Sequence, residues 1–186
     1  MSKRWIFGKN VILSGASGGL GFAIAKLLIE KYDCNVIGIA RNEQKLLSNR
    51  ETLGEKKDKF SYKLFDVSIK DNWVNFANEL NKNNFVPDVL INNAGFMLPF
   101  AKLEYVNDND IDEIVKTNLL SCVYSAKAFI PLLKKSSTPA IVNISSAAGL
   151  CPVVGESMCC LTKFGVRGFT ESLQQEYKNQ FYIGGV

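Results

Sequence analysis

The chain has 186 residues, of which 47% are hydrophobic and 22% charged, and its formal net charge is +4. This length suits one domain with a substantial core, so we expect a single domain over residues 1–186. The basic residues are scattered, and no apolar run approaches the length of a membrane span. We therefore expect no nucleic-acid partner, no membrane association and a cytoplasmic location.

The cysteines and the absence of histidine limit the chemistry that is available. The chain has 5 cysteines and no histidine. An odd number of cysteines without an export signal or a C-x-x-C pair predicts free thiols. The lack of histidine excludes Ser-His and Cys-His nucleophilic mechanisms and removes the commonest zinc ligand, so we expect no metal site.

The first predicted elements are a short strand, a glycine-rich turn and a helix. The turn follows the apolar run Val11 to Leu13, and the apolar positions from Leu20 to Leu28 have helical spacing. Such a turn can bring backbone N–H groups to a pyrophosphate at a helix N-terminus, although glycines also gather in ordinary loops. The candidate phosphate-binding residues are Ser14, Gly15, Ser17, Gly18, Gly19, Leu20 and Gly21.

A second strand is predicted over residues 35–39, about twenty residues after the turn, where dinucleotide-binding folds place the group that reads the adenosine ribose. Here that position holds Ala40, Arg41 and Asn42, without a carboxylate for the ribose 2′-hydroxyl. Arg41 could pair with a 2′-phosphate, or could simply begin a solvated helix. NADP is favoured over NAD on this basis.

A helix over about 42–52 and a strand over 60–65 follow, and Asp66 and Val67 end the strand. The Asp66 carboxylate could accept from an adenine amino group. It could equally serve as the N-cap of the next helix, which is expected from about Ile69 to Lys82. We leave both interpretations open.

The next strand, 88–91, ends in Asn92, Asn93, Ala94 and Gly95, small and amide residues that suit a close backbone approach to a ligand. One long helix is expected over about 109–133, and Asn118 lies on its apolar stripe. A buried amide needs a hydrogen-bonding reason, either a neighbouring backbone or a water or catalytic side chain. A buried strand over 140–144 then leads to Ser145 and Ser146.

Strands that alternate with helices predict an α/β fold, a Rossmann-like doubly wound parallel sheet of strand order 3-2-1-4-5. In such a sheet, ligands bind at the carboxyl ends of the strands near the point where the strand order reverses. The glycine turn, Arg41, Asp66, Asn93 and Ser146 all follow strand ends. The sequence therefore predicts a nucleotide site at this edge.

With these motifs, the chain resembles the short-chain dehydrogenase/reductase family over essentially its whole length. The glycine turn matches the family's cofactor motif with Ser14 for the usual Thr, and Asn92 to Gly95 match its NNAG motif. The resemblance implies that Asn118 anchors a water, that Ser146 binds the substrate oxygen, and that Lys163 holds the ribose and assists a tyrosine. That tyrosine would stand at position 159, which is Cys159 here.

Cys159 is expected to impair catalysis, because a thiol falls an aromatic ring short of a substrate oxygen that a proton donor must approach to roughly 2.6–3.2 Å. A positioned acid is worth roughly 10²–10⁴-fold in rate. A lysine one helical turn away should lower the pKa of the thiol, so we expect an alkylating reagent to modify Cys159 before Cys34, Cys122 or Cys160, and bound NADP to slow that reaction. The alternative is that Cys159 is a small buried hydrophobe.

The helix of the 155–179 region is followed by Phe181 to Val186, which look like the beginning of a sixth strand. We expect a domain that is C-terminally incomplete relative to the family, with the adenosine half of the site complete. The leading hypothesis is an NADP-dependent oxidoreductase that transfers hydride between the cofactor and a small alcohol or carbonyl substrate, with impaired catalysis. The alternative is a catalytically inactive nucleotide-binding or interaction module, and in either case a homo-oligomer is possible.

Overall fold

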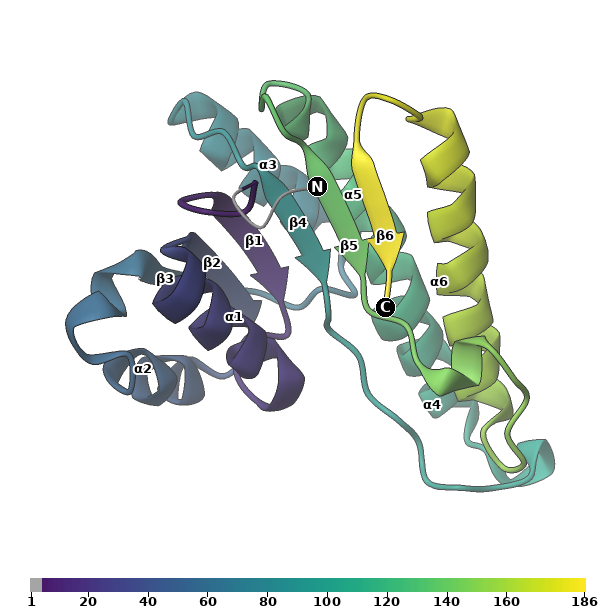
Figure 1. Cartoon of the computed structure of the whole chain (residues 1–186). Coiled ribbons are helices and arrows are strands. Elements are labelled where there is room, and N and C mark those ends of the chain that lie inside the picture. The colour runs from purple at the N-terminus through teal and green to yellow at the C-terminus, as the bar shows by residue number, and fades with distance from the viewer. Residues whose placement is uncertain (1–4) are drawn as a thin grey trace.

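A parallel six-stranded sheet of order β3-β2-β1-β4-β5-β6 forms the centre of the protein. The computed structural model describes residues 5–186 (Figure 1). The order confirms the predicted 3-2-1-4-5 arrangement, and the sixth strand pairs with β5 through Ala140 opposite Tyr182. The strands are β1 Asn10–Ser14, β2 Asn35–Ala40, β3 Phe60–Leu64, β4 Val89–Asn92, β5 Ala140–Asn143 and β6 Tyr182–Gly185.

Helices cover both faces of the sheet, as expected for right-handed crossovers between parallel strands (Figure 1). The α-helices are α1 Gly19–Tyr32, α2 Glu43–Glu51, α3 Lys70–Lys82, α4 Asp108–Ile114, α5 Ser121–Leu133 and α6 Ser157–Glu176. Short 3₁₀ turns occur at Gly54–Lys59, Leu103–Tyr105 and Ala147–Gly149. None of the helices in residues 5–186 combines the length and apolarity needed to cross a membrane.

Alternation along the strands divides the core into two clusters. Val11 and Leu13 of β1 pack with α1 on one face, whereas Ile12 between them packs with α3 and α5 on the other. Side chains of successive strand residues point to opposite faces, so each central strand contributes to both clusters. Trp73 of α3 and Phe129 of α5 are fully buried in the second cluster, with their rings edge to face at 5.9 Å.

The long helix predicted over 109–133 is not a continuous α-helix. It comprises α4, a π-helical segment at Val115–Leu120 (η3), and α5. A π-segment arises where one extra residue is accommodated, and such segments are frequent at functional sites. Asn118 lies within this π-helical segment. The departure from α-helical geometry therefore occurs at the polar residue that was predicted to be part of the site.

Candidate active site

A cleft of about 920 Å³ opens at the carboxyl ends of the strands, where the strand order reverses between β1 and β4. It brings together most of the predicted site residues: Gly15, Ser17, Gly18, Gly19, Leu20, Gly21, Arg41, Asp66, Val67, Asn93, Ala94, Gly95, Ser146, Cys159 and Lys163. Ser14, Asn42 and Asn118 are not among its lining residues.

The glycine turn is built so that backbone, not side chains, faces the cleft. Gly15 and Gly19 have φ values of +70° and +52°, a conformation that favours glycine. A Cβ on Gly15 would lie 2.8 Å from Asn93 Nδ2, and one on Gly21 would collide with the Gly15 carbonyl oxygen. Gly18 and Gly19 have nothing within 4 Å of the Cβ position, so the tip of the turn is open to a ligand.

Ser14 and Asn93 hold this turn against the end of β4. The Ser14 hydroxyl oxygen accepts from the backbone N–H groups of Asn93 and Ala94, each at 3.0 Å. Asn93 Nδ2 donates to the carbonyl oxygens of Ser14 and Gly15 at 3.1 and 3.3 Å. The two strand ends on either side of the reversal are therefore tied by side chains that the sequence motifs identified.

At the end of β2, the Arg41 side chain is 72% exposed and its guanidinium lies 3.5 Å from the Asp66 carboxylate. Asn42 is the N-cap of α2, where its Oδ1 accepts from the Lys45 N–H at 2.9 Å. Arg41 thus keeps donors free toward the cleft, while the Asn42 side chain is used by its own helix.

The suggestion that Asp66 caps α3 is wrong, because the N-cap of that helix is Ile69. The Asp66 carboxylate instead accepts from the Ser68 N–H at 2.9 Å, within the turn that leads into α3. Burial opposes ionisation of Asp66, but the hydrogen bonds from Ser68 and the charge of Arg41 outweigh it and lower the pKa. Asp66 is therefore an ionised acceptor at the end of the cleft that Arg41 lines.

Asn118 is almost fully buried, and both polar atoms of its side chain form hydrogen bonds with the backbone of one residue, Phe96. Its Oδ1 accepts from the Phe96 N–H at 2.9 Å, and its Nδ2 donates to the Phe96 carbonyl oxygen at 2.8 Å. A Cβ on Gly95 would lie 3.1 Å from Asn118 Oδ1 and 3.7 Å from Lys163 Nζ. Of the two reasons considered for a buried amide here, the structure shows the neighbouring backbone.

Lys163 and Cys159 lie one turn apart on α6 and both line the cleft. Lys163 Nζ donates to the Ile144 carbonyl oxygen at 3.0 Å, and burial lowers the pKa of its ammonium. The exposed Ser146, three residues after the end of β5, lines the same cleft. Its Oγ accepts from the Ala148 N–H at 3.2 Å. A lysine, a hydroxyl and a thiol therefore share this end of the cleft.

The expectation that the pKa of Cys159 is lowered is wrong, although Lys163 does act in the lowering direction. Burial raises the pKa of this thiol, the charge of Glu156 raises it further, and the opposing effect of Lys163 is smaller. Cys159 is 8% exposed, so desolvation dominates over a single nearby cation. All five cysteines are free thiols, as predicted.

Several lining residues were not predicted from sequence, among them Met97, Glu113 and Thr117. Glu113 and Thr117 are spaced one helical turn apart and Thr117 immediately precedes Asn118, which is the signal that could have identified them. Among residues 5–186, no group of three or more His, Cys, Asp or Glu side chains is arranged to hold a metal ion.

A buried polar network beneath the cleft was also missed. Asn92 at the end of β4 donates to Asn143 Oδ1 of β5 at 2.8 Å, and Asn143 donates to the Thr170 hydroxyl of α6 at 2.8 Å. Ser125 of α5 donates to Asn92 Oδ1 at 2.7 Å. Every member has a partner, so the network connects β4 and β5 to two helices without leaving a buried polar group unpaired.

Comparison with known proteins agrees with this architecture. A family model described as short chain dehydrogenase matches residues 9–183. An uncharacterised oxidoreductase of Staphylococcus saprophyticus is 36% identical over 169 residues, which cover 90% of this chain and 67% of that protein. The chain therefore spans about two thirds of the length of this curated relative.

Solved structures show the same fold. A short chain dehydrogenase from Shigella flexneri superposes with a TM-score of 0.91 at 22% identity, covering 100% of this chain and 74% of that one. A metagenomic short-chain oxidoreductase in complex with NADP superposes with a TM-score of 0.86 at 28% identity, covering 94% of this chain and 79% of that one. The fold and cleft define a Rossmann-like α/β protein of the dinucleotide-binding type. The chain belongs to the short-chain dehydrogenase family.

Proposed function

We propose that this chain, as a single nucleotide-binding domain, binds NADP(H) in the cleft and descends from oxidoreductases that act on a small alcohol or carbonyl compound. The bound nicotinamide would supply the hydride. The residues present fit the cofactor, because the open tip of the glycine turn at Gly18 and Gly19 leads into α1, whose N-terminal N–H groups favour phosphate. The metagenomic relative in complex with NADP, at 28% identity, supports this proposal.

NADP is proposed rather than NAD because Arg41 lies at the end of β2. Its guanidinium is largely exposed, and Ala40 precedes it where a carboxylate would be expected for a free ribose hydroxyl. A planar guanidinium can bind a phosphate through two parallel hydrogen bonds. Asp66 would accept from the adenine amino group, and Asn93, Ala94 and Gly95 would help to hold the cofactor.

At the other end, Lys163 would hold the ribose hydroxyls, since its ammonium has one donor on Ile144 and further donors to offer. Ser146 would donate to the substrate oxygen, and Asn118 would fix the Phe96 backbone beside it. Cys159 occupies the place of the family's proton donor. Its short side chain and raised pKa make it a poor acid, so proton delivery would require an intervening water.

The second candidate is a catalytically inactive nucleotide-binding or interaction module, in which α5 and α6 serve for self-association. The observation that favours it is Cys159 itself, which removes the acid and leaves the cofactor half of the cleft intact. Both candidate functions predict NADP binding, but only the first predicts hydride transfer to a substrate.

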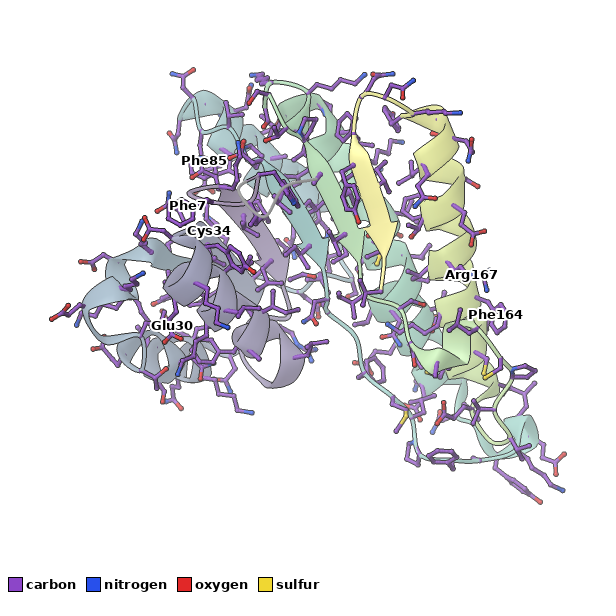
Figure 2. All side chains as sticks on the ribbon, in the orientation of Figure 1. Phe7, Glu30, Cys34, Phe85, Phe164 and Arg167 are labelled. Carbon is purple, nitrogen blue, oxygen red and sulfur yellow. The ribbon has the colours of Figure 1, made fainter. Side chains whose placement is uncertain are left out.

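Two measurements test the proposal. Titration with NADPH and NADH should show tighter binding of NADPH, and Arg41→Asp should reverse or abolish that preference. Arg167→Asp is the matched control, because Arg167 is an exposed arginine on α6, across the molecule from α2 (Figures 1 and 2). Equal affinities in the parent chain would contradict the NADP assignment.

The catalytic part is tested by reduction of a panel of aldehydes and ketones with NADPH. Cys159→Tyr should raise the rate by roughly 10²–10⁴-fold over the parent, whereas Cys159→Ala should leave it unchanged. NADPH binding without reduction in any variant would favour the inactive module.

A further inference from the structure

The tip of the glycine turn is held from outside the cleft by α2. Asn49, in the last turn of α2, donates from Nδ2 to the carbonyl oxygen of Ser17 at 3.0 Å, across 32 positions of sequence. Ser17 lines the cleft, whereas Asn49 is partly buried behind it. Among residues 5–186, this is the one side-chain hydrogen bond to Ser17, Gly18 or Gly19.

The base of the same turn is secured by other contacts. The N–H groups of Gly15 and Ala16 donate to the Ile39 carbonyl oxygen at 2.9 and 3.2 Å, and Asn93 binds the Ser14 and Gly15 carbonyls. The tip has no comparable packing, since Gly18 and Gly19 have open space at their Cβ positions. Without Asn49, the Ser17–Gly18 peptide would lack a side-chain partner that sets its orientation.

That orientation matters because a trans peptide points its C=O and the following N–H in opposite directions. Asn49, which is not among the residues that line the cleft, binds the Ser17 carbonyl oxygen. The Gly18 N–H on the same peptide therefore points away from Asn49. Gly18 is the N-cap of α1, where a phosphate would meet unpaired N–H donors.

The candidate 2′-phosphate group, Arg41, lies just before the start of the same helix, α2. Arg41 lies two residues before α2, and Asn42 caps that helix through Lys45. Helix α2 therefore connects the candidate 2′-phosphate site at one end with the turn that would hold the pyrophosphate at the other.

We propose that Asn49 is a positioning residue for the cofactor pyrophosphate, acting by holding the Ser17 carbonyl outward so that the Gly18 N–H is presented to the phosphate. The proposal rests on the proposed NADP binding. It assigns to α2 and the adjoining Arg41 parts in binding the pyrophosphate and the 2′-phosphate of one cofactor.

The test compares two ligands that share the adenosine 2′-phosphate, namely NADP⁺ and adenosine 2′-monophosphate, which lacks the pyrophosphate and the nicotinamide riboside attached to it. Asn49→Ala should weaken NADP⁺ binding by about five- to tenfold, the effect of one lost hydrogen bond, and leave adenosine 2′-monophosphate affinity within about twofold. Asn49→Asp, which keeps the shape and loses the donor, should weaken NADP⁺ at least as much. Gln44→Ala, an exposed position on the same helix, is the control and should change neither affinity.

The outcomes separate the possible failures. Unchanged NADP⁺ affinity in Asn49→Ala would overturn the inference alone. Equal weakening of both ligands would show that Asn49 merely holds α2 in place, and would also overturn it. A parent chain that does not bind NADP⁺ would overturn the proposed function and this inference together.

Discussion

Ser14 and Asn93 join the ends of β1 and β4 by hydrogen bonds that run in both directions. The backbone N–H of Asn93 donates to the Ser14 hydroxyl at 3.0 Å, while the Asn93 amide donates to the Ser14 carbonyl oxygen at 3.1 Å. These strands flank the reversal of strand order, where the cleft opens. The pair therefore ties together the two loops that follow β1 and β4.

Removing the Ser14 hydroxyl should destabilise the protein, because the N–H groups of Asn93 and Ala94 would both lose their acceptor. We expect Ser14→Ala to lower the free energy of unfolding by about 1–3 kcal/mol. Ser14→Thr retains the hydroxyl and should lose less. Urea unfolding measures both variants, and an alanine variant as stable as the parent would refute the structural role of this hydroxyl.

The Asp66 carboxylate should make the free energy of unfolding depend on pH in the acidic range. Its pKa is lowered in the folded state, so its contribution is present above the unfolded-state value of about 3.9 and is lost as the pH falls through the folded value. Asp66→Asn should be less stable than the parent near neutral pH, and the difference should vanish in acid. Unfolding free energies measured across that range test this expectation.

The control for Asp66 is Asp110→Asn, which removes a partly exposed carboxylate from α4. It should not remove the same acid dependence. Parallel loss of stability in the parent and in Asp66→Asn as the pH falls would contradict the assignment.

The cysteines should react with an alkylating reagent in the order of their exposure. Cys151 is exposed and should be labelled first, and the partly exposed Cys160 should follow. Cys159 is 8% exposed with a raised pKa and should react more slowly than both. Cys122 is buried with its pKa raised to about 11 and should be among the slowest. Bound NADP should slow only Cys159, which lines the cleft. Peptide mapping after brief alkylation decides this, and labelling of Cys159 ahead of Cys151 would contradict the burial argument.

The polar network beneath the cleft should depend on the Thr170 hydroxyl. Thr170→Val keeps the shape but leaves the buried Asn143 amide without its acceptor, so we expect a loss of about 1–3 kcal/mol in unfolding free energy. Thr170→Ser preserves the hydroxyl and serves as the matched control. If valine and serine variants unfold at the same urea concentration as the parent, the hydrogen bond adds nothing to stability.

Much of the site could be predicted because its signals are local. The glycines, the Arg41 position and the residues after β4 and β5 are identified by short patterns next to strands, and parallel strands bring such ends to one edge. Asn118 could be singled out because a polar residue on an apolar stripe is visible in sequence. Its partner Phe96 could not be identified, because nothing in the local pattern pairs residues 22 positions apart.

By itself, the sequence determined the order of the elements, the parallel sheet and the placement of a nucleotide-binding edge, since hydrophobic periodicity and turn residues are properties of neighbouring positions. Only the tertiary structure decided the pKa of Cys159, because burial and Glu156 outweigh the lysine one turn away. It also decided the partner of Asn49 and the π-helical turn at Asn118. Desolvation and contacts between distant segments arise only when the chain has packed, and no local pattern encodes their balance.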